Sequence, residues 1–279
     1  MRKLFSSQLI EARHEMLSIF EAIDLTLHDA VSAFSSNDRN LAKKAQNACA
    51  SIDARSANLE AVCYNLIATQ SPVASDFRLL QTIIYVNFNL QRMSDKVRRI
   101  ARAARHKVKF DIELPEELVD LIDREAECVY QVLGASASAL VSSDLGQIMG
   151  LSDQDEAVRS IYAKFFREYN RMNAEDMADD SALDDLRRVI MVSRYLDRIA
   201  AISTDAAFRV TFLLTGQRLS ATDLMDTDED ELEGMRVPAG EGVTLNPERD
   251  ARYVAALAPD EVGETLAALM ADAEADTTE

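Results

Sequence analysis

No glycine occurs before Gly134 in this 279-residue chain, and the only prolines ahead of it are Pro72 and Pro115. Glycine and proline are the residues that most often interrupt helices. The whole chain holds only 8 glycines, 5 prolines and no tryptophan, and 48% of its residues are hydrophobic. This composition predicts an all-α protein with enough apolar side chains to form a substantial core.

Hydrophobic residues at three- and four-residue spacing predict six long helices. They are expected to cover residues 5–34, 39–68, 72–107, 115–141, 144–172 and 181–215. We expect Asp38 to cap the second helix and Gly216 to end the sixth. Between the second and third helices, Ser71 is the expected N-cap and Pro72 the first helical residue, where a missing N–H costs nothing.

The chain also repeats itself. A single shift of the numbering places Glu21 on Glu127 and Asp38 on Asp144. The same frame pairs Leu27 with Leu133, Ser36 with Ser142, Val86 with Val192, Leu90 with Leu196, Arg92 with Arg198 and Ala101 with Ala207. Random helices share apolar positions but rarely share a turn and a cap in one frame. We therefore predict a duplicated three-helix unit, residues 1–110 and 111–216, followed by a tail, residues 217–279.

The net charge of −18 is concentrated in that tail, where 17 acidic and 4 basic residues give −13. The tail is expected to be flexible and largely disordered, with short amphipathic helices within residues 249–275 that could dock on a partner. So acidic a chain is a poor candidate for nucleic acid binding. The local basic run at residues 96–109 is interpreted as a solvated helix end rather than a polyanion site.

The cysteines and the apolar segments indicate the cellular compartment of the protein. Three cysteines, at positions 49, 63 and 128, are odd in number and lack metal-ligand spacing, which favours a reduced cytoplasmic protein. The segment from Met1 to Met16 does not resemble a secretory signal, and the sequence has no apolar stretch long enough to span a membrane. Membrane insertion is therefore not expected.

The usual catalytic motifs are absent from the sequence, which contains no Gly-rich phosphate loop, G-x-S-x-G or HExxH. This predicts a protein that is not an enzyme. One Glu-x-x-His pair, Glu11 and His14, is typical of di-iron helical bundles. Because such bundles need two of these motifs, we interpret His14 as a surface or packing residue.

Acidic residues at helical spacing suggest a metal site. Asp53 and Glu60 are seven positions apart, and Gln91 and Asp95 are four apart, so each pair shares a helix face. If the second and third helices are neighbours, these oxygens could converge on a hard or borderline cation. The alternative is that they are exposed acids on solvated faces.

Residues 52–78, IDARSANLEAVCYNLIATQSPVASDFR, resemble the signature of the PhoU family of phosphate-signalling regulators. The matching residues are Ile52, Asp53, Glu60, Cys63, Ala68, Gln70, Pro72, Val73, Ala74, Asp76 and Arg78. Residues 194–216 are similar to the second copy of the family pattern through Arg194, Leu196, Arg198, Ile199, Ala207, Val210, Leu213, Thr215 and Gly216. The resemblance covers about residues 5–216 and implies two tandem three-helix bundles.

The resemblance also implies a function. PhoU-like proteins are cytoplasmic adaptors that restrain a phosphate ABC transporter through its ATPase, quieten a sensor histidine kinase and commonly form homodimers. It further implies that motif residues contribute to docking or interhelical contacts. These are Gln70, Pro72, Asp76, Arg78, Gln91, Arg92, Asp197 and Arg198.

Family members bind metal through an E-x-x-x-D pair in each repeat, and this chain departs from that pattern. The first pair is Gln91 and Asp95, and the second is Asp197 and Ala201. Arg159 also stands in the frame of Asp53, so the second site is expected to be lost. The first site keeps Asp53, Glu60 and Asp95 as candidate ligands for a divalent or ferric ion.

Two alternatives to the phosphate-signalling adaptor remain open. A metal-storage or metal-dependent redox bundle would hold stoichiometric iron, zinc or manganese. An adaptor for a different transporter would use the acidic tail to contact its partner.

Overall fold

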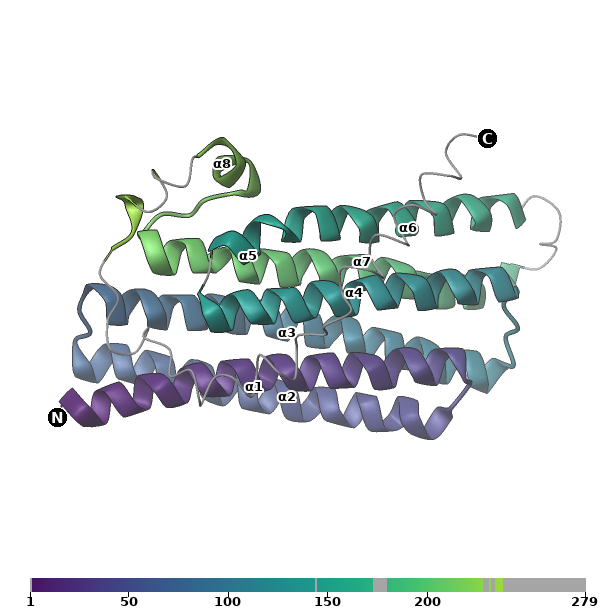
Figure 1. Ribbon diagram of the computed structural model, residues 1–279. Helices are drawn as coiled ribbons and strands as arrows, with labels where there is room; N and C mark the ends of the chain where they lie inside the picture. The colour runs from purple at the N-terminus through teal and green to yellow at the C-terminus, as the bar shows by residue number, and fades with distance from the viewer. Residues whose placement is uncertain (1, 144, 173–179, 228–230, 232–233, 238–279) are drawn as a thin grey trace.

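The computed structural model describes residues 2–143, 145–172, 180–227, 231 and 234–237. Six long helices dominate this part of the chain, with two short helices, α5 and α8, and no strand (Figure 1). The helices are α1 (Arg2–Ser35), α2 (Arg39–Gln70), α3 (Ala74–Phe110), α4 (Glu116–Ser142), α5 (Leu145–Met149), α6 (Leu151–Met172), α7 (Asp180–Thr215) and α8 (Ala221–Asp226).

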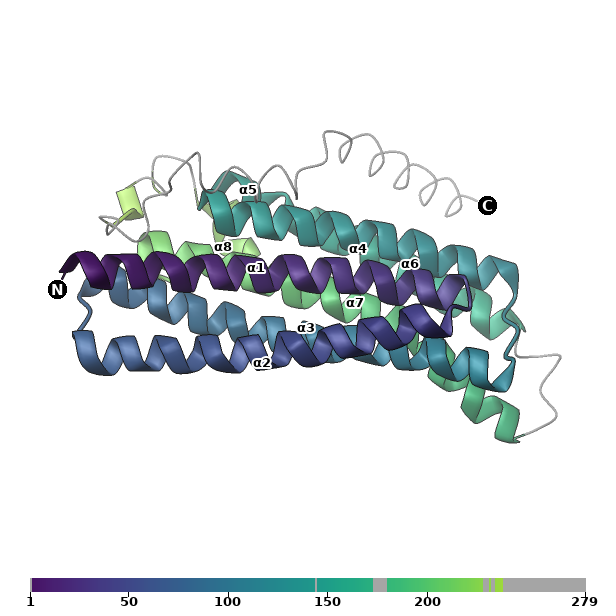
Figure 2. The same cartoon turned by 90° about the horizontal axis from the view of Figure 1, so that it is seen from below.

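The long helices form two three-helix bundles that lie side by side. Helices α1, α2 and α3 pack against one another, as do α4, α6 and α7. Figure 2 shows α2 along one side of the molecule and α4 with α6 along the other. Helices α3 and α7 share the most extensive contact of any pair in the described chain, and they join the two bundles. We call this contact the α3–α7 seam.

The seam relates equivalent helices of the two repeats, because the frame that pairs Leu90 with Leu196 also places the start of α3, Ala74, on the start of α7, Asp180. The two helices run in opposite directions. Arg78 near the start of α3 bonds to the carbonyl of Leu213 near the end of α7, whereas Arg99 lies over the ring of Tyr195. At one end of the seam the start of α3 lies beside the end of α7, and at the other end the start of α7 lies beside the end of α3. Equivalent positions of the two repeats therefore occur at both ends.

The core is one continuous apolar cluster running through both bundles. Phe20, Phe34 and Phe165 are among its largest fully buried side chains. Burying such a side chain contributes about 1.5–3 kcal/mol, so the apolar stripes hold the helices together. The three cysteines are buried and free. None of the helices in the described ranges has the length and apolar character needed to cross a membrane.

Two predicted helix boundaries are confirmed. Asp38 caps α2, and its Oδ1 accepts hydrogen bonds from the backbone N–H groups of Asn40 (2.8 Å) and Leu41 (3.0 Å). Gly216 ends α7 with φ of 76°, a left-handed conformation that glycine adopts without a steric penalty. Its N–H donates to the carbonyl of Phe212 at 2.9 Å.

The prediction for Ser71 and Pro72 is wrong. Helix α2 continues to Gln70, and Ser71 is its C-cap in the left-handed region (φ 45°, ψ 59°). Helix α3 begins only at Ala74, after an extended Val73 whose carbonyl accepts from the N–H of Asp76. Because the connection between the two antiparallel helices is so short, Ser71 must end the first helix, and Pro72 lies in the connection.

The predicted helix over residues 144–172 is interrupted at Gly150, which separates α5 from α6. Glycine inside a helix costs about 1 kcal/mol relative to alanine, so a break there is inexpensive. The break lets Ile148 and Leu151 both be fully buried. Asp144 lies outside the described residues.

The structure adds a feature beyond the predicted end of the second repeat. Residues 217–227 fold back on the bundle, where Ser220 and Asp223 form a capping box for α8 and Leu224 is buried. The N–H of Val237 donates to the carbonyl of Leu214 at 2.9 Å. The amphipathic stretch at 249–275 lies outside the described residues.

Candidate functional site

The predicted metal residues of the first repeat lie on neighbouring helices, and basic side chains already pair with two of them. Asp53 on α2 accepts a hydrogen bond from Ser94 Oγ at 2.9 Å and forms an ion pair with Arg98. Asp95 on α3 pairs with Lys96 at 3.0 Å and Arg99 at 2.9 Å. Burial pushes the pKa of Asp95 upward, but hydrogen bonds from the two cations lower it overall below its ordinary value.

The other two predicted residues of this repeat, Glu60 and Gln91, line a separate groove. This groove has a volume of about 610 Å³ and lies between α2 and α3. Its lining is mainly apolar and aromatic, and Tyr64, Phe77 and Phe88 expose 54%, 38% and 58% of their surface. We call it the aromatic groove. The remaining lining residues are Ile67, Gln81, Ile84, Tyr85, Asn87 and Arg209.

The second repeat replaces this arrangement with buried acids. Arg159 stands in the frame of Asp53 and pairs with Asp155 at 2.5 Å. Burial raises the pKa of Asp155 and of Asp197. Glu125, which was not among the predicted residues, is fully buried on α4 and accepts a hydrogen bond from Ser193 Oγ.

Glu125 could have been found from spacing alone. It lies four positions from both Leu121 and Val129, on the buried face of α4. Burial raises its pKa well above the ordinary glutamate value, and its Oε1 has no hydrogen-bond partner among the described residues. A carboxyl group in such a place favours its neutral form. It is a feature of the second repeat only, because the equivalent residue of the first repeat is Ile19.

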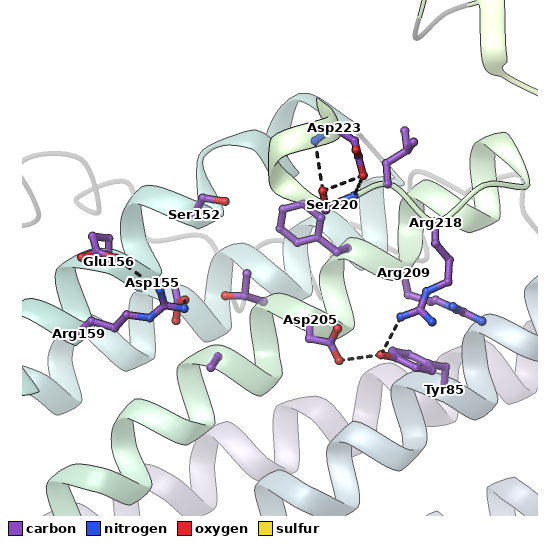
Figure 3. A pocket seen from close by; sticks show the side chains of 14 residues that line it. Tyr85, Ser152, Asp155, Glu156, Arg159, Asp205, Arg209, Arg218, Ser220 and Asp223 are labelled. Atoms are coloured by element: carbon purple, nitrogen blue, oxygen red, sulfur yellow. Dashed lines mark hydrogen bonds and ion pairs between the residues drawn. The ribbon is translucent and has the colours of Figure 1, made fainter. Parts of the chain in front are cut away.

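A further groove lies at the seam between α3, α6, α7 and residues 218–223, with a volume of about 800 Å³ (Figure 3). Tyr85 Oη donates to Asp205 Oδ2 at 2.8 Å, and Asn89 donates to the same oxygen at 3.1 Å. Arg218 donates to Tyr85 Oη at 3.4 Å. We call it the tyrosine groove.

A second arginine of the tyrosine groove is packed between aromatic rings. The guanidinium of Arg209 lies 4.4 Å from the ring centre of Tyr85 and 4.6 Å from that of Phe212. Burial and then the nearby Arg218 lower its pKa, while burial and the bond to Asp205 raise the pKa of Tyr85. Altogether the groove is lined by three arginines and four carboxylates, so its charges largely neutralise one another.

Of the motif residues, Arg78 connects two helices, whereas Arg92, Asp197 and Arg198 make the following contacts within their own helix. Arg78 Nε donates to the carbonyl of Leu213 at 3.3 Å, which ties the start of α3 to the end of α7. Arg92 donates to Asn89 at 2.9 Å and lies over the exposed ring of Phe88. Asp197 and Arg198 form a long ion pair of 4.0 Å.

The other motif residues lie at the turn between α2 and α3. Gln70 is the last residue of α2, and Asp76 lies in the first turn of α3. Pro72 is in the connection between them. These three positions shape the helix junction at one end of the first bundle.

The family comparison matches the duplicated architecture. The profile of the family described as the PhoU domain matches residues 16–104 and again residues 122–210. The chain belongs to the PhoU family. The two matches start and end in the same frame that pairs Glu21 with Glu127 in the sequence (122 minus 16 equals 210 minus 104). The predictions of the family and of two tandem three-helix bundles are confirmed.

Relatives in the PhoU family share the length of the helical part. The chain is 27% identical over 223 residues to a Clostridium acetobutylicum protein named phosphate-specific transport system accessory protein PhoU homolog, covering 80% of this chain and 99% of the relative. It is 26% identical over 217 residues to PhoU homolog 1 of Methanothermobacter thermautotrophicus, covering 78% and 97%.

Two crystal structures have the same fold. PhoU from Pseudomonas aeruginosa aligns with a TM-score of 0.70 at 23% identity, covering 76% of this chain and all of that one. The phosphate transport system regulatory protein PhoU from Streptococcus pneumoniae aligns with a TM-score of 0.68 at 21% identity, covering 77% and 99%.

The side chains of this PhoU family member do not fit a metal cluster of the kind the resemblance implies. Two of the three candidate carboxylates, Asp53 and Asp95, are paired with cations, and Glu60 lies in the aromatic groove. Over the described ranges, no three His, Cys, Asp or Glu side chains gather as a metal site. The geometry therefore gives the metal prediction no support.

Proposed function

We propose that this protein is a regulatory adaptor of phosphate uptake and phosphate-responsive signalling. The observation that carries the proposal is the match of both repeats to the PhoU domain, together with relatives whose names describe a phosphate-specific transport accessory protein. The adaptor acts by protein contacts and performs no catalytic step. Its partners are the ATPase of a phosphate ABC transporter and a sensor histidine kinase, and the adaptor itself is cytoplasmic.

We assign the transporter ATPase to the aromatic groove. Tyr64 and Phe88 are more than half exposed and flank a hollow large enough for side chains of a partner. Exposed aromatic residues around a groove are typical of protein interaction sites, because they bury large areas at low entropic cost. Glu60 and Gln91 supply polar groups within the same groove. Binding there would bias the ATPase between its conformations.

The test is phosphate uptake in a strain that lacks this protein. Deletion should raise uptake when phosphate is plentiful, and the wild-type gene should restore restraint. Tyr64→Asp with Phe88→Asp should fail to restore it and should lose co-purification with the ATPase. The matched control, Leu4→Asp with Leu25→Asp, changes two exposed residues of α1 outside the groove and should restore restraint.

Two outcomes would count against these proposals separately. Unchanged uptake after deletion would refute the adaptor function. Full restoration by the groove variant would move the docking site elsewhere while leaving the function intact. Homodimer formation, which the resemblance implies, is tested on the same samples by analytical ultracentrifugation.

A further inference from the structure

A second groove on the α3–α7 seam, at the opposite end from the tyrosine groove, is lined mainly by basic residues. It has a volume of about 650 Å³. Helix α3 contributes Arg99, Arg102, Ala103 and His106, and helix α7 contributes Arg187, Arg188, Met191 and Tyr195. Among the described lining residues are four arginines and a histidine, and no carboxylate. We call it the arginine groove.

The spacing of these residues explains why they meet. On α3, Arg99, Arg102 and His106 recur every three or four positions, as do Arg188, Met191 and Tyr195 on α7, so each set lies on one helix face. The basic run at 96–109 thus contributes one wall of a groove. The opposite wall comes from a helix of the other repeat, much later in the chain.

At least two of the arginines are available to a ligand. The side chains of Arg102 and Arg188 are exposed and form no hydrogen bond or ion pair with the described part of the chain. Arg99 pairs with Asp95, but 49% of its side chain remains exposed, and its guanidinium lies 6.0 Å from the ring centre of Tyr195. Like charges gathered around a concave surface repel one another unless an anion enters.

The dimensions favour an anion longer than a single phosphate. His106 follows Arg99 by seven positions, and Tyr195 follows Arg188 by seven. At a rise of about 1.5 Å per residue, each wall is about 10 Å long. The volume of the groove is typical of a small-molecule site. Arginine is the side chain best suited to phosphate, because its planar fork donates two parallel hydrogen bonds.

We propose that the arginine groove binds a small anion carrying two or more linked phosphate groups. Arg102 and Arg188 donate hydrogen bonds to the phosphates from opposite walls. Arg99 and Arg187 add positive charge along the groove. The Tyr195 ring and the Met191 side chain provide an apolar surface for the remainder of the ligand. This site does not depend on the family comparison or on the proposed docking of the ATPase, and ligand binding alone tests it.

The experiment is isothermal titration calorimetry of the full chain at low salt with pyrophosphate, ADP and sulfate. Pyrophosphate and ADP should bind, and sulfate should bind at least about tenfold more weakly. Arg102→Gln with Arg188→Gln should weaken pyrophosphate binding by about a hundredfold, since each lost charge-assisted hydrogen bond is worth about a factor of ten. Arg102→Lys with Arg188→Lys should give an intermediate loss, because lysine keeps the charge without the fork.

The matched control is Arg39→Gln with Arg171→Gln, which removes two exposed arginines outside the groove. It should leave the affinity within about twofold. Three results would overturn the proposal: no binding of pyrophosphate or ADP at millimolar concentration, equal weakening by the control, or equal affinity for sulfate. A polyglutamate peptide that binds and is not displaced by pyrophosphate would also overturn it, in favour of an acidic protein segment. Circular dichroism of each variant checks that the helices remain.

Discussion

The two ends of the α3–α7 seam are built from the same positions of two repeats, but their chemistry differs. Equivalent pairs across the two grooves are Tyr85 and Met191, Asn89 and Tyr195, Arg99 and Asp205, Arg102 and Phe208, and Ala103 and Arg209. At one end Asp205 accepts from Tyr85 and Asn89, near two arginines. At the other end the equivalent residue is Arg99, and the groove is cationic.

The difference shows that the repeat preserves packing and leaves surface charge free to diverge. Leu90 and Leu196 are equivalent and both are fully buried, and so are Val86 and Val192. Apolar side chains in a close-packed interface are constrained by shape. Charged groups at the rim are constrained only by their neighbours, so one end of the seam can be neutral and the other can attract anions.

The largest expected effect is a loss of stability on substituting Leu90 or Leu196, the buried leucines at equivalent positions of the two repeats. Leu90→Ala and Leu196→Ala should each lower the free energy of unfolding by about 3 kcal/mol, because each leaves a cavity in the buried core. Urea denaturation followed by circular dichroism measures both. A large loss in one variant beside a negligible loss in the other would show that the two repeats do not depend equally on these equivalent core positions.

The next effect concerns a buried acid that only the second repeat has. Burial raises the folded-state pKa of Glu125 above its ordinary value of 4.5, so the folded protein holds this proton more tightly than the unfolded chain does. Its contribution to stability is fully present below pH 4.5 and is lost as pH rises through the folded-state pKa. Glu125→Gln should therefore be more stable than the wild type at pH 8, by about 1 to 3 kcal/mol.

That advantage should shrink as pH falls toward 4, where the wild-type carboxyl group is neutral in the folded protein and mostly neutral in the unfolded chain. Urea denaturation at the two pH values provides the test. An advantage of equal size at both would mean that Glu125 does not titrate differently in the folded protein. Glu125→Ile places the equivalent residue of the first repeat, Ile19, at this position and tests whether the second repeat remains stable with an apolar side chain there.

A smaller effect compares the equivalent residues Asp205 and Arg99. Asp205→Asn weakens the bonds from Tyr85 and Asn89 and removes a carboxylate whose charge acts on Arg209, so a loss of about 1 kcal/mol is expected. Arg99→Gln removes a half-exposed ion pair and a long contact with the Tyr195 ring, and it should cost under about 0.5 kcal/mol. Thermal or urea denaturation of both variants shows whether Asp205 in the tyrosine groove contributes more to stability than Arg99 in the arginine groove.

The smallest expected effect is on metal content. Because Arg98 pairs with Asp53, and Lys96 and Arg99 pair with Asp95, we expect Asp95→Ala to leave the metal content of the purified protein unchanged. Element-resolved mass spectrometry of untagged wild type and variant measures it. Stoichiometric metal that disappears in the variant would show that a cation displaces these ion pairs.

The fold could be predicted because its determinants are local. Apolar spacing indicates the six long helices, and Asp38 and Gly216 mark ends that depend on a single residue's backbone preference. The role of Ser71 is not local, because the same residue type can end one helix or begin the next, and the choice depends on the path of both. Gly150 is ambiguous for a similar reason, since an isolated glycine interrupts some helices and is tolerated in others.

The grooves could not be predicted, since their walls come from distant parts of the sequence. Tyr85 and Asp205 are 120 residues apart, and Arg218 reaches Tyr85 from a segment expected to be flexible. The arginines of α3 are visible as a basic run, but nothing in the sequence indicates that Arg187 and Arg188 face them. The aromatic groove likewise depends on which faces of α2 and α3 remain exposed.

The antiparallel packing of equivalent helices across the seam has the form of an isologous interface enclosed within one chain. In a dimer of identical single repeats, every substitution on this surface would appear twice, once at each end. A mutation that made one end cationic would do the same to the other, and the two changes could not be selected independently. Joining the repeats removes that constraint, so each end of the seam can specialise while the packed centre stays symmetric.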